Sequence, residues 1–211
     1  MKKYVVVYFL MMLSCAKSFA QKVAGDCTIT YKVSAADATL DSNVINDAYK
    51  KFYVSGGKAL TEISFSGFNQ QTFYNENNDN VYILYLMNGQ KYMRLLTKEQ
   101  WKEQYKNYKD AKLQTLDKTE KILGYTCKKA IATLRDGTTI NLYYTSEIKT
   151  NIAENPYEFD NINGLVLKYE AEIQHKYKIT YTASSIDFNP VPAEKFTLPK
   201  QGYRMLNNNH Q

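Results

Sequence analysis

The sequence is poor in the side chains on which most catalytic and metal sites depend. Its 211 residues contain two histidines, His175 and His210, and three cysteines. Catalysis of the Ser-His-Asp or Cys-His kind needs an oriented imidazole, and zinc sites need clustered Cys and His ligands. The CxxC, HExxH and EF-hand spacings and the glycine-rich phosphate loops are absent. We therefore expect no enzyme, no metal and no cofactor, although a site built from Asp and Glu alone would leave no such motif.

Clustered positive charge is missing as well. The chain has a formal net charge of +6 and 27 Lys and Arg residues, of which Lys2, Lys3 and Lys17 lie in the first 20 residues. Without these three, 24 basic residues stand against 21 acidic ones, scattered singly or in pairs. A nucleic-acid-binding domain gathers Lys and Arg on one face. We therefore expect no nucleic-acid partner.

Long hydrophobic runs are also lacking, and the apolar run Tyr4–Leu13 has only ten residues. A membrane-spanning helix needs about 20. With lysines before the run and small residues after it, the pattern predicts a signal peptide over residues 1–20, cleaved between Ala20 and Gln21. The less favoured alternative is a lipoprotein acylated on Cys15, since the residues before it make a poor lipoprotein box. Either route places the chain in the periplasm or at the periphery of the outer membrane.

The remaining residues, 21–211, have the length of a single domain with its own core. Two cysteines remain in this part, Cys27 and Cys127. An oxidising compartment allows them to form a disulfide, which would close a loop of about 100 residues and stabilise the fold by about 4–5 kcal/mol. The alternative is two separate buried thiols, because the sequence does not show whether the two Cα atoms lie close enough.

Two-residue alternation of apolar and polar side chains runs through residues 21–211 and predicts β-strands. Asn88-Gly89 and Asp136-Gly137 favour tight hairpin turns, because both central residues of such turns need positive φ. The alternation over residues 165–181 is too long for one strand, so we place a hairpin loop around residues 173–176. The pattern predicts a mainly β protein, with a single strongly curved antiparallel sheet, an incomplete barrel, of about nine or ten strands.

One or two helices complete the predicted fold. Thr97 and Gln100 have the spacing of a capping box, and Trp101, Tyr105 and Tyr108 then share one helical face. We expect this aromatic face to pack the helix against the sheet, inside its curve or across its mouth. Stacking on a sugar or a base is the alternative role of the same side chains.

An apolar ligand site needs no motif, because each buried methylene contributes about 0.8 kcal/mol. The absence of polar motifs therefore does not count against a lipid or a lipoprotein acyl chain as the ligand, and this is our first hypothesis. The alternative is an envelope interaction or assembly protein with a filled core and no small ligand. The side chains that would line a lipid site on the concave sheet face are Tyr82, Leu84, Leu86, Ile140, Leu142, Tyr144, Tyr177, Ile179 and Tyr181.

Several segments of the second half resemble a known family of exported proteins. Residues 121–130 read KILGYTCKKA, residues 143–148 read YYTSEI, and residues 196–199 read FTLP. These segments, with the run INGLVLKYE at 162–170, resemble the family named for its GLPGLI motif and related envelope families. The chain departs from that motif at Asn163, where proline is usual. The resemblance implies the fold of lipoprotein-sorting (LolA-like) carriers, an incomplete barrel around a hydrophobic cavity, and it implies no catalytic residue.

Overall fold

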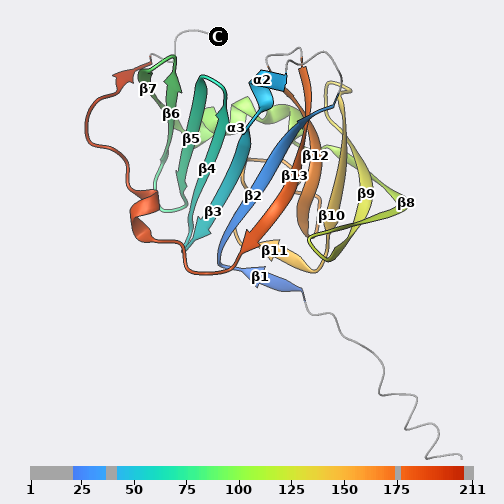
Figure 1. The fold of residues 1–211 in the computed structure, drawn as a ribbon. Helices are drawn as coiled ribbons and strands as arrows, with labels where there is room; N and C mark the ends of the chain where they lie inside the picture. The colour runs from blue at the N-terminus through green and yellow to red at the C-terminus, as the bar shows by residue number, and fades with distance from the viewer. Residues whose placement is uncertain (1–20, 37–41, 174–176, 207–211) are drawn as a thin grey trace, which may run out of the picture.

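The computed structural model describes residues 21–36, 42–173 and 177–206. A curved sheet of 12 strands makes up most of this part of the chain (Figure 1). Its strands, in chain order, are β2 (Asp26–Ala35), β3 (Tyr49–Ser55), β4 (Lys58–Phe65), β5 (Phe68–Asn75), β6 (Asn80–Met87), β7 (Gln90–Thr97), β8 (Lys112–Ile122), β9 (Tyr125–Thr133), β10 (Thr139–Thr145), β12 (Leu165–Ile173), β13 (Tyr177–Asp187) and β14 (Arg204–Met205). The remaining elements are β1 (Lys22–Ala24), β11 (Ile148–Thr150), the helices α2 (Ser42–Ile45) and α3 (Lys98–Gln104), and the 3-10 turns η2 (Lys106–Tyr108) and η3 (Ala193–Phe196).

The large sheet is open, with β14 and β8 at its two edges. Its strand order is β14-β7-β6-β5-β4-β3-β2-β13-β12-β10-β9-β8, and the neighbours are antiparallel except β14 and β7. A separate parallel pair, β1 and β11, lies at one end of the curve, the lower end in Figure 1. The prediction of a mainly β fold with one strongly curved, unclosed sheet is confirmed, with somewhat more strands than the nine or ten expected.

Both predicted turns join neighbouring strands, but at Asp136-Gly137 only Gly137 has a positive φ, so the connection from β9 to β10 is longer than the predicted tight turn. Asn88 and Gly89 have φ of 49° and 77°, so both adopt the positive values that the tight turn requires. Ile173 of β12 pairs with Tyr177 of β13, so the two strands form a hairpin whose loop, residues 174–176, lies outside the described residues. His175 and His210 also lie outside them.

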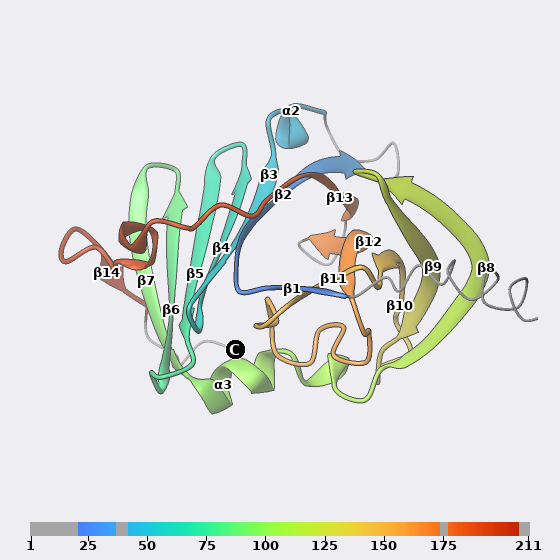
Figure 2. The same ribbon diagram turned by 90° about the horizontal axis from the view of Figure 1, so that it is seen from below.

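Helix α3 begins at the predicted capping box. The Gln100 backbone N–H donates to Thr97 Oγ1 at 3.2 Å, and the Thr97 backbone N–H donates to Gln100 Oε1 at 2.9 Å. Trp101 is buried, with its ring centroid 5.1 Å from that of Tyr74 on β5. Together α3 and η2 lie along the open side of the curve, between the ends of β7 and β8 (Figure 2). The aromatic face therefore packs the helix across the mouth of the sheet, as expected.

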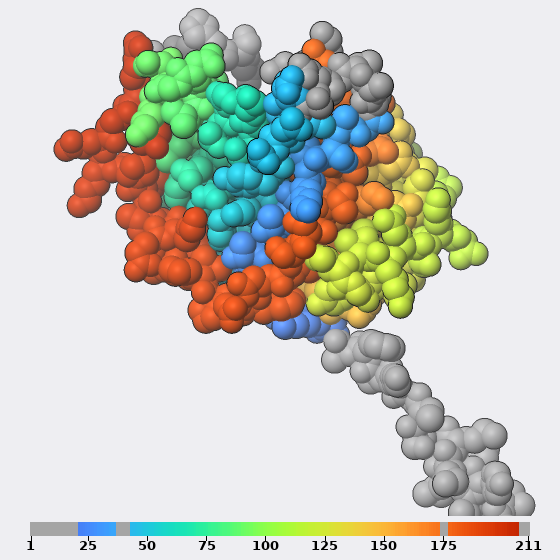
Figure 3. All heavy atoms as spheres, viewed as in Figure 1, coloured from blue at the N-terminus to red at the C-terminus, as the bar shows by residue number. Residues whose placement is uncertain are grey.

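Apolar side chains cover both faces of the large sheet. The main core lies on the concave face and includes Ile29, Leu142, Leu167 and Ile179. A smaller cluster lies on the convex face and packs beneath the C-terminal segment, residues 188–206, which forms a red band along one side in the space-filling view (Figure 3). We call this cluster the outer seam; its members are Tyr53, Leu60, Phe73, Leu84 and Val191, with Tyr82, Met93, Phe196, Leu198 and Tyr203 partly buried against it.

Both cysteines are buried in the concave core, and both are free thiols. Cys27 lies on β2 and Cys127 on β9, and three strands, β13, β12 and β10, separate them in the sheet. Neighbouring strands are about 4.8 Å apart, whereas a disulfide needs Cα atoms within about 7 Å. The structure therefore corrects the expected disulfide to the alternative of two separate buried thiols. Burial raises the pKa of each thiol to about 11.

Candidate functional site

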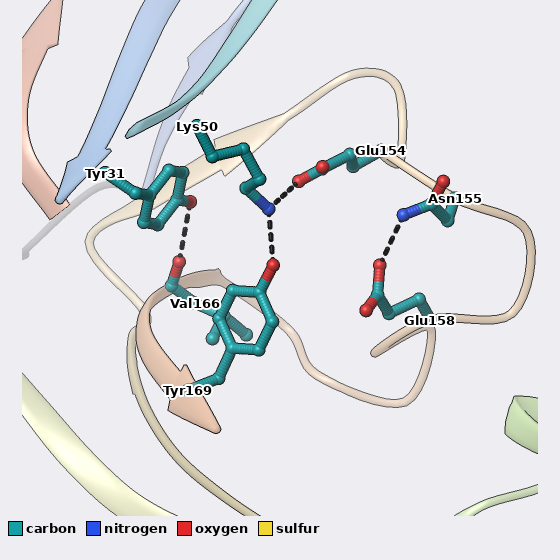
Figure 4. Close-up of polar contacts among 7 residues, drawn as sticks. All are labelled: Tyr31, Lys50, Glu154, Asn155, Glu158, Val166 and Tyr169. Carbon is teal, nitrogen blue, oxygen red and sulfur yellow. Dashed lines mark hydrogen bonds and ion pairs between the residues drawn. The ribbon is translucent and has the colours of Figure 1, made fainter. Parts of the chain in front are cut away.

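A fully buried lysine lies at the centre of the concave face. Lys50 on β3 is 1% exposed, because it alternates in phase with Phe52 and Val54, whose side chains also point into the core. Its Nζ donates to Glu154 Oε2 at 2.6 Å and to the hydroxyl of Tyr169 (Figure 4). A buried ammonium is stable only when it is paired and hydrogen-bonded, and Lys50 meets both conditions.

Three tyrosine rings surround the same ammonium group. The Lys50 Nζ lies 4.7 Å from the ring centroid of Tyr31, 4.8 Å from that of Tyr169 and 5.0 Å from that of Tyr181. The sheet brings these residues together, since Tyr31 pairs with Lys50 between β2 and β3, and Tyr169 pairs with Tyr181 between β12 and β13. Such ring faces attract a cation, and most strongly when water is excluded.

The segment between β11 and β12, residues 151–164, covers this group of side chains. It supplies Glu154 and also Glu158, whose Oε2 accepts a hydrogen bond from Asn155 Nδ2 at 2.7 Å (Figure 4). Tyr157 and Phe159, on either side of Glu158, have φ of 64° and 60°. Bulky residues rarely adopt this left-handed conformation, so the strained backbone marks the loop as a candidate for function.

Gly164 ends this segment where the chain passes close to β10. A Cβ atom at this position would lie 2.1 Å from the backbone oxygen of Thr145. Any other residue would therefore push the segment away from the sheet, and with it the two glutamates. Gly164 belongs to the INGLVLKYE run of the sequence, so part of that run is explained by this close approach.

A cavity of about 250 Å³ lies between the segment and the sheet. Glu154 and Glu158 line it, and the exposed residues Lys149, Asn151 and Asp160 lie at its border with solvent. Aromatic rings form much of the remaining wall, from Tyr31, Phe52, Phe159 and Tyr169. The cavity thus combines hydrogen-bonding carboxylates with apolar ring surfaces.

The two glutamates differ in their surroundings. Glu154 is paired with Lys50, whereas burial and the nearby charge of Glu154 raise the pKa of Glu158 to about 7, against the opposing effects of Lys50 and of the Asn155 hydrogen bond. Burial also raises the pKa of the Tyr31 and Tyr169 hydroxyls well above their ordinary value. Near neutral pH the site therefore holds neutral phenols, an ion pair, and one carboxyl that gains or loses its proton easily.

None of the nine side chains predicted to line a lipid site lines this cavity. Tyr82, Leu84 and Leu86 on β6 face the convex side, where Tyr82 and Leu84 belong to the outer seam and Leu86 is 36% exposed. This placement corrects the expectation that β6 presents these three residues to the concave face. The others do belong to the concave core or pack against it, and they are Ile140, Leu142, Tyr144, Tyr177, Ile179 and Tyr181.

The residues that do line the cavity were not predicted from the sequence. Lys50 carried a signal, because it stands in the inward phase of a strand in which Phe52 and Val54 are apolar. Glu154 and Glu158 carried none, since they lie in a segment with no periodicity. In the described ranges no group of three or more His, Cys, Asp or Glu side chains is placed to hold a metal ion. The helices in those ranges are too short or too polar to cross a bilayer.

The sequence matches the family model described as the N-glycanase peptide, N-terminal domain, over residues 29–201. The chain therefore belongs to this family of N-terminal domains. No curated protein matches the chain. The resemblance to the GLPGLI family stays a prediction.

Three solved structures are similar to the chain. PNGF-II in the P21 space group is 18% identical, with 87% of this chain and 31% of that chain covered and a TM-score of 0.48. PNGF-II in the C2 space group is also 18% identical, with coverages of 85% and 30% and a TM-score of 0.44. A LolA superfamily protein, NE2245 from Nitrosomonas europaea, is 12% identical, with coverages of 84% and 92% and a TM-score of 0.34. The chain thus spans about a third of the length of the PNGF-II structures.

Proposed function

We propose that this chain is a ligand-binding domain that takes one small hydroxylated unit, such as a sugar residue, into the cavity between residues 151–164 and the sheet. The observation that supports this most directly is the lining of that cavity. Carboxylates accept hydrogen bonds from hydroxyl groups, and ring faces such as those of Phe52 and Phe159 pack against the C–H surface of a sugar. The volume of about 250 Å³ is just below the usual range for drug-sized ligands, which suits one small unit.

The family adds a second reason for this ligand class. Its description names an N-glycanase, so its named member acts on glycans. A domain of that family with a polar, ring-walled cavity is well suited to hold a glycan unit. We propose that this chain binds such a unit without cleaving it, because glycoside hydrolysis generally uses two free carboxyl groups and Glu154 is already paired with Lys50.

An acyl chain fits this cavity less well. Burying methylenes beside Glu154, Glu158 and Asp160 would remove water from the carboxylates without replacing its hydrogen bonds. The lipid hypothesis and the filled-core alternative remain proposals that the same binding experiment separates. We also propose that the chain works in the periplasm or at the outer-membrane periphery, because its first 20 residues have the pattern of a signal peptide. Residues 1–20, with Cys15, lie outside the described residues.

The test is ligand-observed NMR with glucose, mannose, N-acetylglucosamine and octanoate. We expect at least one sugar to bind and octanoate not to bind. The substitution Ala153→Trp at the exposed mouth of the cavity should abolish sugar binding, whereas Ala193→Trp, at an exposed position in η3, should leave it unchanged. If octanoate binds and Ala153→Trp abolishes that binding, the ligand is a lipid and not a sugar. If none of the probes binds, the filled-core hypothesis is favoured. Release of nitrophenol from nitrophenyl glycosides would contradict a purely binding role.

A further inference from the structure

The charges around the cavity are not balanced. Glu154 is compensated by Lys50, whose Nζ lies 2.6 Å from its Oε2. Glu158 has no basic partner among the described residues, and its only hydrogen bond there is the one that Asn155 donates to Oε2. Its Oε1 is without a hydrogen bond in the same part of the chain. Glu158 lines the cavity and is only partly exposed, so Oε1 is left for a ligand there.

Lys50 acts against the raised pKa of Glu158, but its ammonium group is already paired with Glu154. Asp160 adds a further carboxylate at the mouth, and Lys149 is exposed there and free to extend into solvent. The tyrosines are neutral near pH 7, since the ordinary tyrosine pKa is about 10 and burial raises it further. Besides Asp160 and Lys149, the titratable groups around Glu158 are, by element, Tyr31 on β2, Lys50 on β3, Tyr105 and Tyr108 beside α3 and η2, Glu154 on the covering segment, Tyr169 on β12 and Tyr181 on β13.

We propose that the ligand carries a primary ammonium group on its small hydroxylated body, and that this group binds Glu158 Oε1. The inference rests on the proposed function and names the class of ligand within it. The protein already holds one ammonium group in the same manner next to the cavity, where Lys50 Nζ contacts a glutamate and tyrosine rings. A ligand ammonium would meet a second glutamate and the rings of Phe159 and Tyr169.

Binding of an ammonium group then depends on pH in a defined direction. The ligand favours the ionised carboxylate, while burial and Glu154 raise the pKa of Glu158 to about 7. Below this pH the ligand must displace a proton, so affinity falls as the pH falls. From pH 8 to pH 6 the ionised fraction of Glu158 drops about tenfold, and the affinity should drop by the same factor. A proton is released on binding at the lower pH.

The experiment is calorimetric titration of the full chain with glucamine and with sorbitol, which differ only by an ammonium group in place of a hydroxyl. We expect glucamine to bind at least tenfold more tightly than sorbitol at pH 8, and about tenfold more weakly at pH 6 than at pH 8. Titrations in two buffers of different ionisation enthalpy should show proton release at pH 6. Glu158→Gln, which keeps the acceptor for Asn155, should remove the preference, whereas Glu120→Gln on β8 should not.

Equal affinities for glucamine and sorbitol, with no pH dependence, would overturn the ammonium proposal and leave the hydroxylated ligand in place. Failure of glucamine, sorbitol and the sugars together would instead overturn the proposed function. Because the pH dependence and proton release are measured on the unchanged chain, the test does not depend on the folding of the Gln variant. An ethanolamine lipid could present the same ammonium group. If the chain sediments with phosphatidylethanolamine vesicles but does not bind glucamine, the proposal that the ligand is a small hydroxylated molecule is wrong.

Discussion

The two faces of the sheet solve the same packing problem with different chemistry. On the convex face the outer seam consists of Leu, Phe, Tyr and Val side chains beneath the C-terminal segment. The ion pair beside it is partly open to solvent, since Lys195 is 44% exposed, although Glu62 is 14% exposed, and Lys195 Nζ lies 3.6 Å from Glu62 Oε1. On the concave face the covering segment, residues 151–164, brings Glu154 onto the buried Lys50. One face is therefore closed by apolar packing, and the other by packing combined with a buried ion pair.

This difference indicates where specificity resides. An apolar seam tolerates changes of shape as long as its volume is kept. A buried ion pair fixes the position of both partners, because removing either one leaves an uncompensated charge. The concave face therefore positions its covering segment accurately beside a cavity, whereas the convex face only needs to be covered.

The largest expected effect comes from breaking the buried ion pair. Lys50→Met should lower the free energy of unfolding by about 3–5 kcal/mol, since Glu154 would be left uncompensated near the core. Lys168→Met is the matched control, because the Lys168–Glu120 pair is about one-third exposed and such pairs contribute about 0–1 kcal/mol. Urea denaturation measures both. Equal losses in the two variants would show that the concave face is held by packing alone.

The outer seam should respond to loss of volume and not to loss of charge. Leu84→Ala should lower the free energy of unfolding by about 2–5 kcal/mol, because Leu84 is 2% exposed and its truncation leaves a cavity. Leu86→Ala, two residues along the same strand face and 36% exposed, should stay within about 1 kcal/mol. Thermal denaturation compares the two variants. Leu84→Ala should also leave ligand binding unchanged, and a loss of binding would mean that the two faces are coupled.

The pH dependence of stability should be specific to the concave face. The folded-state pKa of Glu158 is raised to about 7, so the native state binds more protons than the unfolded state between about pH 4.5 and 7. Its contribution to stability therefore falls as the pH rises through this window, by up to about 3 kcal/mol. The free energy of unfolding of the Glu158→Gln variant should equal that of the parent protein at pH 4.5 and exceed it at pH 8, as measured by urea denaturation at the two pH values. A constant difference across this range would contradict the raised pKa.

The smallest effect concerns the two cysteines of the concave core. Burial raises the thiol pKa of Cys27 and Cys127 to about 11, so neither should react with a thiol reagent at pH 8 in the folded protein. In a Cys15→Ser background both should react once urea unfolds the chain, with a count of two thiols. A count of zero after unfolding would show that the two cysteines are joined.

Much of the fold was accessible from the sequence, because strands and turns depend on neighbouring residues. The tight turn forms at Asn88-Gly89, and the capping box of α3 forms with both of its hydrogen bonds. The candidate site was not accessible in this way. Lys50 gave a weak signal through its inward phase, while Glu154 and Glu158 lie on an aperiodic segment whose path depends on distant contacts.

What the sequence by itself determined is the alternation of side chains along each strand and the positions of the turns. That alternation defines two faces but does not say which one becomes concave, so Tyr82, Leu84 and Leu86 were assigned to the wrong side. Only the tertiary structure decided this, because the curvature of the sheet and the path of residues 151–164 and 188–206 depend on contacts between segments far apart in the chain. The same long-range contacts place Glu154 and Glu158 beside Lys50 and thereby create the site.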